Sequence, residues 1–127
     1  MPGREGGGLK RTDVNGSRYK AVKRSLRNRG LPCWICGGAI RYDLPPGHPL
    51  SFEYDHYFPA SRWMEFGYPS LAAATLDPAN GRASHRICNQ RRGDAMPGEQ
   101  RWLRMFGNGE KREARAPTPP EKRSHAT

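Results

Sequence analysis

The sequence predicts a small α+β domain, and three observations lead to this class. Two pairs of potential metal ligands, Cys33-x-x-Cys36 and His85-x-x-Cys88, frame the centre of the chain. Between them, residues 52–58 alternate in polarity as a half-buried strand does, whereas segments on either side repeat apolar residues at helical spacing. The 127 residues leave room for one core only. Since a core this small commonly needs a metal, disulfides or a partner, the paired ligands predict a stabilising metal site.

The domain is expected to span residues 17–106, with a flexible tail on each side. Residues 1–16 are rich in glycine and charge, and residues 107–127 combine glycine, proline and charge with few large apolar side chains. Three cysteines cannot all pair within one chain, and no apolar stretch resembles a signal peptide. We therefore expect a cytoplasmic protein with metal-bound thiolates.

Charge is distributed unevenly along the chain. The formal net charge is +10, with +7 on residues 4–30, −3 on residues 31–80 and +6 on residues 81–127. Basic flanks around an acidic centre suit a protein that binds a polyanion and holds a cation in the middle. Anionic membranes or an acidic protein could use the same charges, but no segment has the roughly 20 apolar residues that cross a bilayer.

The first expected element is a helix over residues 17–29. Ser17 can cap it, Tyr19, Val22 and Leu26 recur on one face, and Gly30 can end it. The other faces are mostly lysine and arginine. This helix could lie along a phosphate backbone while its apolar stripe docks on the domain.

Two strands are expected next, a short one over residues 39–42 and a longer one over residues 52–58. Alternation places Tyr54 and His56 on one face of the longer strand and Asp55 on the other. If Asp55 and His56 act on one phosphate, a twist, bulge or strand end must bring them together. Residues 61–76 predict a helical or irregular insertion, residues 85–95 a helix, and residues 102–106 a weaker helix.

The ligand pairs favour structural zinc. Two ligands separated by two residues can reach one ion from a tight turn or a helix start, and two such pairs complete a tetrahedral shell of Cys33, Cys36, His85 and Cys88. A single Cys-x-x-Cys could equally be a redox pair or two buried thiols. The second pair favours zinc, and a full shell leaves no open position for catalysis.

The order of these motifs resembles the HNH endonuclease family, the zinc-supported branch of the ββα-metal or His-Me finger nucleases. The resemblance covers residues 33–93 and consists of Cys-x-x-Cys, Asp-His, a later Asn, and His-x-x-Cys-Asn-x-x-Arg-Gly. It implies a ββα-metal domain, which the basic helix expected over residues 17–29 would precede. Small HNH proteins of this kind often belong to bacteriophages and act beside the packaging terminase, in the host cytoplasm.

The resemblance also implies a role for each matching residue. His56 matches the general base that activates water, and Asp55 and Asn89 match the two protein ligands of a catalytic Mg²⁺ or Mn²⁺ ion. Asn80 matches the asparagine that bridges backbone groups and orients the histidine, although after Asp77-Pro78 it could instead be a turn residue. The chain would be a His-Asn-Asn variant of the motif.

These roles agree with the chemistry of the residues. Oxygen ligands suit a hard cation that serves phosphoryl transfer, and an imidazole with an ordinary pKa of about 6.5 can accept a proton from water near neutrality. Four arginines are candidates for binding nucleic acid: Arg24, Arg86, Arg91 and Arg92. The alternative is that they are ordinary exposed arginines with no ligand. Glu53 and Asp43 could supplement the acidic site, but no motif selects them.

The sequence therefore favours a monomeric or weakly dimeric endonuclease that hydrolyses double-stranded DNA, one strand at each site. The competing class is a non-catalytic, zinc-stabilised nucleic-acid-binding module, which explains the charge and the ligand pairs but gives Asp55, His56 and Asn89 no purpose. RNA is an open alternative as substrate. No motif indicates which DNA sequence is cut or what the biological role is.

Overall fold

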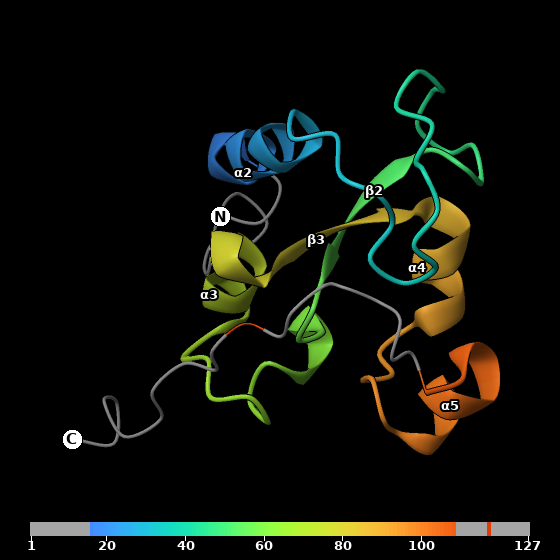
Figure 1. The fold of residues 1–127 in the computed structure, drawn as a ribbon. Helices are drawn as coiled ribbons and strands as arrows, with labels where there is room; N and C mark the ends of the chain where they lie inside the picture. Colours follow the sequence, from blue (N-terminus) through green and yellow to red (C-terminus); the bar gives the residue numbers. More distant parts are fainter. Residues whose placement is uncertain (1–15, 109–116, 118–127) are drawn as a thin grey trace.

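The computed structural model describes residues 16–108 and residue 117. It has a mixed α+β fold with a two-stranded sheet, which confirms the predicted class. The two strands cross the middle of the molecule, with α2 and α3 at one end and α4 and α5 at the other (Figure 1). In chain order the elements are α2 (Ser17–Arg27), β2 (Phe52–His56), the 3₁₀ turn η1 (Ala60–Arg62), α3 (Leu71–Leu76), the 3₁₀ turn η2 (Pro78–Asn80), β3 (Gly81–His85), α4 (Arg86–Arg92) and α5 (Gln100–Phe106). Most of both predicted tails lies outside the described residues.

Helix α2 docks on the sheet through the predicted apolar stripe. Leu26 is buried, and the Tyr19 ring meets the Tyr54 ring edge-on at 5.8 Å. The predicted cap is wrong: Gly16 is the N-cap and Ser17 is the first helical residue, with no side chain capping the end. Gly30, at φ +61°, takes the left-handed conformation just after the helix, as expected.

The sheet is an antiparallel hairpin of β2 and β3. Pairing runs without a bulge from Phe52 opposite His85 to His56 opposite Gly81. The sequence did not predict β3, because its residues lack the β-branched and aromatic side chains that mark strands. The strand predicted over residues 39–42 is reduced to one bridge between Arg41 and Ser51, because backbone turns over residues 40–44 end the pairing.

Gly81 lies where β3 passes the Tyr54 side chain. A Cβ atom at Gly81 would come within 2.2 Å of the Tyr54 hydroxyl, which is buried and has no hydrogen-bond partner in the described part of the chain. We expect Gly81→Ala to lower the free energy of unfolding by about 1–3 kcal/mol, the usual cost of overpacking. Urea denaturation would measure this. Gly38→Ala is the control, because its Cβ would meet only ordinary contacts at 3.5 Å or more, and equal losses in both variants would contradict the prediction.

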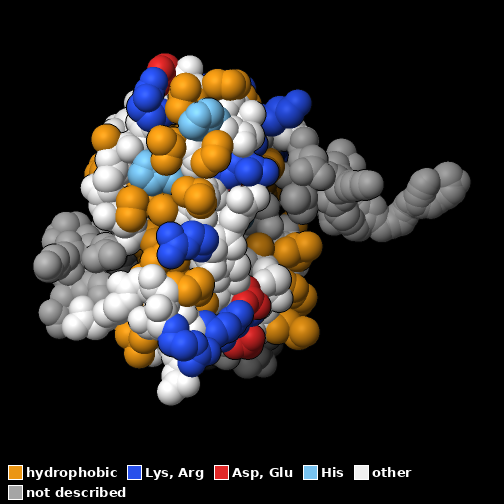
Figure 2. Space-filling view, turned by 90° about the vertical axis from the view of Figure 1, so that its right-hand side faces the viewer, with side chains coloured by type: hydrophobic (Ala, Val, Ile, Leu, Met, Phe, Trp, Pro, Cys, Tyr) orange, Lys and Arg blue, Asp and Glu red, His pale blue; other side chains and the backbone are white. Residues whose placement is uncertain are grey.

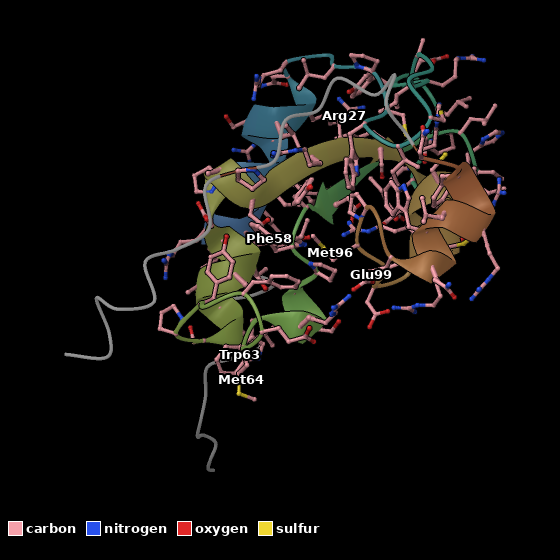
Figure 3. The ribbon with its side chains drawn as sticks, turned by 60° about the horizontal axis from the view of Figure 1, so that its bottom comes forward. Arg27, Phe58, Trp63, Met64, Met96 and Glu99 are labelled. Atoms are coloured by element: carbon pink, nitrogen blue, oxygen red, sulfur yellow. The ribbon has the colours of Figure 1, made fainter. Side chains whose placement is uncertain are left out.

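Two apolar clusters form the interior. The larger one joins α2, the hairpin, α4 and α5, with Ile35, Tyr54 and Trp102 among its buried residues. The smaller one lies under the 60–76 insertion around Phe58 and Tyr68, with Met96 packed against it. Figure 3 shows Phe58 and Met96 directed inward while Met64 points away from the body.

The helices at the far end differ little from expectation. The helix predicted over residues 85–95 is α4, which is shorter because Gly93 adopts φ +58° directly after Arg92. The weaker helix predicted over residues 102–106 is α5. No helix among the described residues has the length and apolar character to cross a membrane.

Candidate metal centre and the neighbouring polar cluster

The four predicted zinc ligands come together at one end of the hairpin. One ligand atom from each of Cys33, Cys36, His85 and Cys88 lies within 4.8 Å of the others. The Nδ1 atom of His85 is 3.4 Å from the Cys36 sulfur and 3.7 Å from the Cys88 sulfur. Tetrahedral zinc with ordinary Zn–S and Zn–N bonds would hold such atoms about 3.6 Å apart. These four residues could bind a metal ion, and their geometry is consistent with structural zinc.

The surroundings of the four ligands also suit a metal. His85 presents Nδ1 to the sulfurs, while its Nε2 lies 2.8 Å from the Ala39 carbonyl oxygen and can donate to it. That bond would fix the tautomer in which Nδ1 carries the lone pair. The backbone N–H groups of Gly38 and His85 approach the Cys36 and Cys33 sulfurs at 3.4 Å each, so the loop is shaped to stabilise negative sulfur.

Without a cation, the surroundings of Cys33 and Cys88 favour the neutral thiol. Burial, with the neighbouring sulfurs adding to it, raises the pKa of Cys88 to about 12. Burial also raises the pKa of Cys33. A divalent cation would reverse this preference, because it stabilises the thiolates and releases their protons.

Asp55 is buried and already well bonded. Its Oδ2 accepts hydrogen bonds from Trp34 Nε1 at 2.9 Å and from the Arg92 guanidinium at 3.0 Å, and its Oδ1 accepts the His56 N–H. Only 7% of the residue is exposed. The carboxylate therefore has a cation partner within the fold.

Arg92 is buried, although the prediction that it binds nucleic acid requires an exposed side chain. It is 1% exposed. The guanidinium donates to Asp55 and to the backbone carbonyls of His56, Tyr57 and Ala95. Its carbon also lies 5.0 Å from the centre of the Trp34 ring. These contacts assign Arg92 to the core, where it joins α4 to the end of β2, and not to a phosphate.

His56 ends β2 on the opposite face from Asp55. Its ring packs edge-on against Tyr54, and its Nε2 lies 3.0 Å from the Thr75 carbonyl oxygen. The predicted alternation of side chains is therefore present. Of the expected distortions, a twist, a bulge or a strand end, the pairing shows no bulge, and the strand ends at His56. Burial lowers the pKa of His56 below its ordinary value, which favours the neutral ring.

Asn80 fastens the segment that follows His56. It is fully buried. Its side-chain oxygen accepts the Phe58 N–H at 2.8 Å, and its amide nitrogen donates to the carbonyls of Phe58 at 3.0 Å and Ala74 at 3.3 Å. Asn80 thus bridges backbone groups of the strand end and α3, which is more than a turn residue would do.

Asn89 contacts Glu53, a carboxylate that no sequence motif selects. Its amide nitrogen donates to the Glu53 carboxylate at 2.7 Å, and Arg86 lies 3.5 Å from the other Glu53 oxygen. Glu53 and Asp55 are two residues apart on β2, and both bond to side chains of α4. The signal that could have found Glu53 is its position two residues before Asp55, on the same face of the strand.

Glu53, Asp55 and Asn89 form a polar cluster whose oxygen atoms are suitable ligands for a hard divalent cation. Carboxylate oxygens of Glu53 and Asp55 and the amide oxygen of Asn89 are the ligands that Mg²⁺ and Mn²⁺ prefer. A cation there would share Asp55 with Arg92. Among the described residues, the sulfur and histidine cluster is the one group of three or more Cys, His, Asp or Glu side chains placed to hold a metal.

The other predicted nucleic-acid contacts are dispersed. Arg24 is exposed on α2, and Arg91 is exposed on α4 with its guanidinium 5.7 Å from the Phe106 ring centre. Figure 2 views the α4 and α5 end, where basic side chains are scattered among hydrophobic ones. This face carries no continuous basic stripe.

Comparison with known proteins identifies no relative: no family model, no curated protein and no solved structure matches the chain.

Proposed function

We propose that the protein is a zinc-stabilised HNH endonuclease that hydrolyses DNA phosphodiester bonds with the help of Mg²⁺ or Mn²⁺. The observation that carries the proposal is the Asn80 bridge, because the motif resemblance gives that residue this task and nothing in composition or charge requires it. The grouping of Asn89 with the β2 carboxylates adds support. Because His56 and Asp55 lie on opposite faces of β2, the proposal requires that one phosphate reaches both side chains around the strand end at His56.

In the proposed reaction, His56 acts as general base. If Nε2 carries the proton and donates it to the Thr75 carbonyl, Nδ1 is left with the lone pair that accepts a proton from water. The water oxygen attacks phosphorus in line, and the bond from phosphorus to the 3′ oxygen breaks. The products carry a 3′-hydroxyl and a 5′-phosphate. Asp55 and Asn89, with Glu53 beside them, would hold the cation, which would stabilise charge on the departing oxygen.

A plasmid-nicking assay tests the proposal directly. With Mg²⁺ or Mn²⁺ added, we expect His56→Ala to nick supercoiled DNA about 10²–10⁴-fold more slowly than the parent, which is the usual contribution of a general base. His48→Ala is the matched control, because His48 is exposed in the loop before β2. Equal nicking by the parent and the folded His56→Ala protein would refute the mechanism.

A non-catalytic nucleic-acid-binding module is the second candidate, and one observation favours it. Asp55 is occupied by Arg92 and Trp34, which is what a purely structural carboxylate would show. Tight DNA binding without metal-dependent nicking would select this candidate. Matched RNA duplexes in the same assay would test RNA as substrate.

The biological setting is proposed by resemblance alone. A small HNH nuclease of this type would work in bacteriophage DNA processing or packaging, beside terminase subunits in the host cytoplasm. Since the fold would present one catalytic site, double-strand cleavage would require two events or a dimer.

A further inference from the structure

A groove runs between α2 and the loop that leads into β2. Its volume is about 480 Å³, within the range of cavities that bind ligands. Its floor is the start of β2, residues 51–54, and one wall is the loop around Leu44 and Pro46. The other wall is α2, which contributes Lys20, Lys23, Arg24 and Arg27.

The four basic residues form one stripe on the helix. They occur at positions i, i+3, i+4 and i+7, which lie along a single face. Helix α2 contains no acidic residue, and among the described residues no carboxylate forms an ion pair with Lys20, Lys23 or Arg24. Like charges at this spacing repel each other, so an anion in the groove would relieve a cost built into the helix.

The groove itself carries little opposing charge. Glu53 is the acidic residue among those that line it, and its carboxylate is bonded to Asn89 and lies close to Arg86. Arg27 is held in place by a 2.6 Å bond to the Tyr42 carbonyl, and Figure 3 shows it on α2 at the side facing the loop. The remaining three cations are exposed, with the Lys23 ammonium 5.2 Å from the centre of the Tyr19 ring.

We infer that this groove binds the sugar–phosphate backbone of one nucleic-acid strand. Phosphates would face the α2 stripe, and the sugars would lie on the apolar side chains of Leu44, Pro46 and Phe52. A flat lipid surface fits less well, because the groove walls would hold its floor away from the membrane. The groove reaches Glu53, the residue bonded to Asn89, so a strand bound there leads toward the proposed catalytic cluster.

DNA as the bound molecule rests on the proposed function, but binding can be measured apart from cleavage. Fluorescence anisotropy with fluorescein-labelled duplex and single-stranded DNA, without added divalent cation, would compare the parent with Lys23→Gln/Arg24→Gln. We expect about tenfold weaker binding at moderate salt, and a slope of log affinity against log salt that is smaller by about 2.

The matched control is Arg18→Gln/Arg29→Gln, which removes the same charge in and just after α2 outside the groove lining. It should bind within about twofold of the parent, since charges remote from a phosphate contribute little to its binding. Equal weakening by both double variants, or none by the groove variant, would overturn the inference. The inference would also be overturned if Lys23→Gln/Arg24→Gln lost binding to phosphatidylglycerol vesicles but bound DNA as the parent does. Groove-dependent binding without nicking would leave the inference standing and remove only the proposed nuclease activity.

Discussion

Removing a zinc ion held by Cys33, Cys36, His85 and Cys88 is expected to unfold the domain. The four ligands join the 33–36 loop, the end of β3 and the first turn of α4, and Cys33 and Cys88 belong to the larger apolar cluster. Zinc binding to such a shell contributes about 10–16 kcal/mol, whereas a whole domain is commonly stable by about 5–15 kcal/mol. Loss of the ion therefore removes an amount comparable with the total stability.

The measurement is metal content followed by circular dichroism. Mass spectrometry of the native protein should find one zinc ion per chain, and a strong chelator should abolish the folded spectrum. His85→Ala should lose zinc and fold poorly, whereas His85→Cys should keep zinc in a four-cysteine shell, because sulfur and imidazole nitrogen are interchangeable ligands. A metal-free protein with three reactive thiols and an unchanged melting temperature would contradict the prediction.

The grouping of the four candidate metal ligands was the part of the site that the sequence predicted best. The spacing within each ligand pair is local in sequence. Two ligands with two residues between them can bind the same ion whatever the rest of the fold is. The pairing of β2 with β3 was harder, because Gly81–His85 has a composition that favours no particular element. Its strand conformation comes from partners that are distant in sequence, such as Tyr54 opposite Ala83.

Burial of charged residues could not be predicted from local pattern. Arg92 occupies a position where the motif places a basic residue, and nothing nearby in sequence indicates that two tryptophans, Trp34 and Trp102, flank its guanidinium. Glu53 was passed over for a related reason. Its importance depends on Asn89, which is 36 residues away in sequence and reaches it only when α4 folds onto β2.

Replacing Arg92 is expected to be one of the most damaging single changes outside the four candidate metal ligands. Arg92→Met would keep much of the side-chain volume but leave the Asp55 carboxylate buried with only Trp34 and a backbone N–H as partners. Breaking a buried ion pair by removing one partner costs about 3–5 kcal/mol. The carbonyls of His56 and Tyr57 would lose their donors as well.

Urea denaturation followed by tryptophan fluorescence would measure this cost. Arg91→Met is the matched control, because Arg91 is the exposed neighbour on the same helix and its loss should change the free energy of unfolding by about 0.5 kcal/mol or less. Similar stability of the two variants would show that the buried pair contributes little.

A double-mutant cycle would then separate the pair from the other contacts of Arg92. Asp55→Asn removes the charge that Arg92→Met leaves unpaired, so the double variant should be more stable than the sum of the two single losses predicts, with a coupling of about 1–3 kcal/mol. The part of the stability loss that Asp55→Asn does not restore would come from the hydrogen bonds between Arg92 and the backbone carbonyls at the end of β2. If the losses simply add, Arg92 stabilises the strand end through those carbonyls alone, and Asp55 is then free to be considered a cation ligand in its own right.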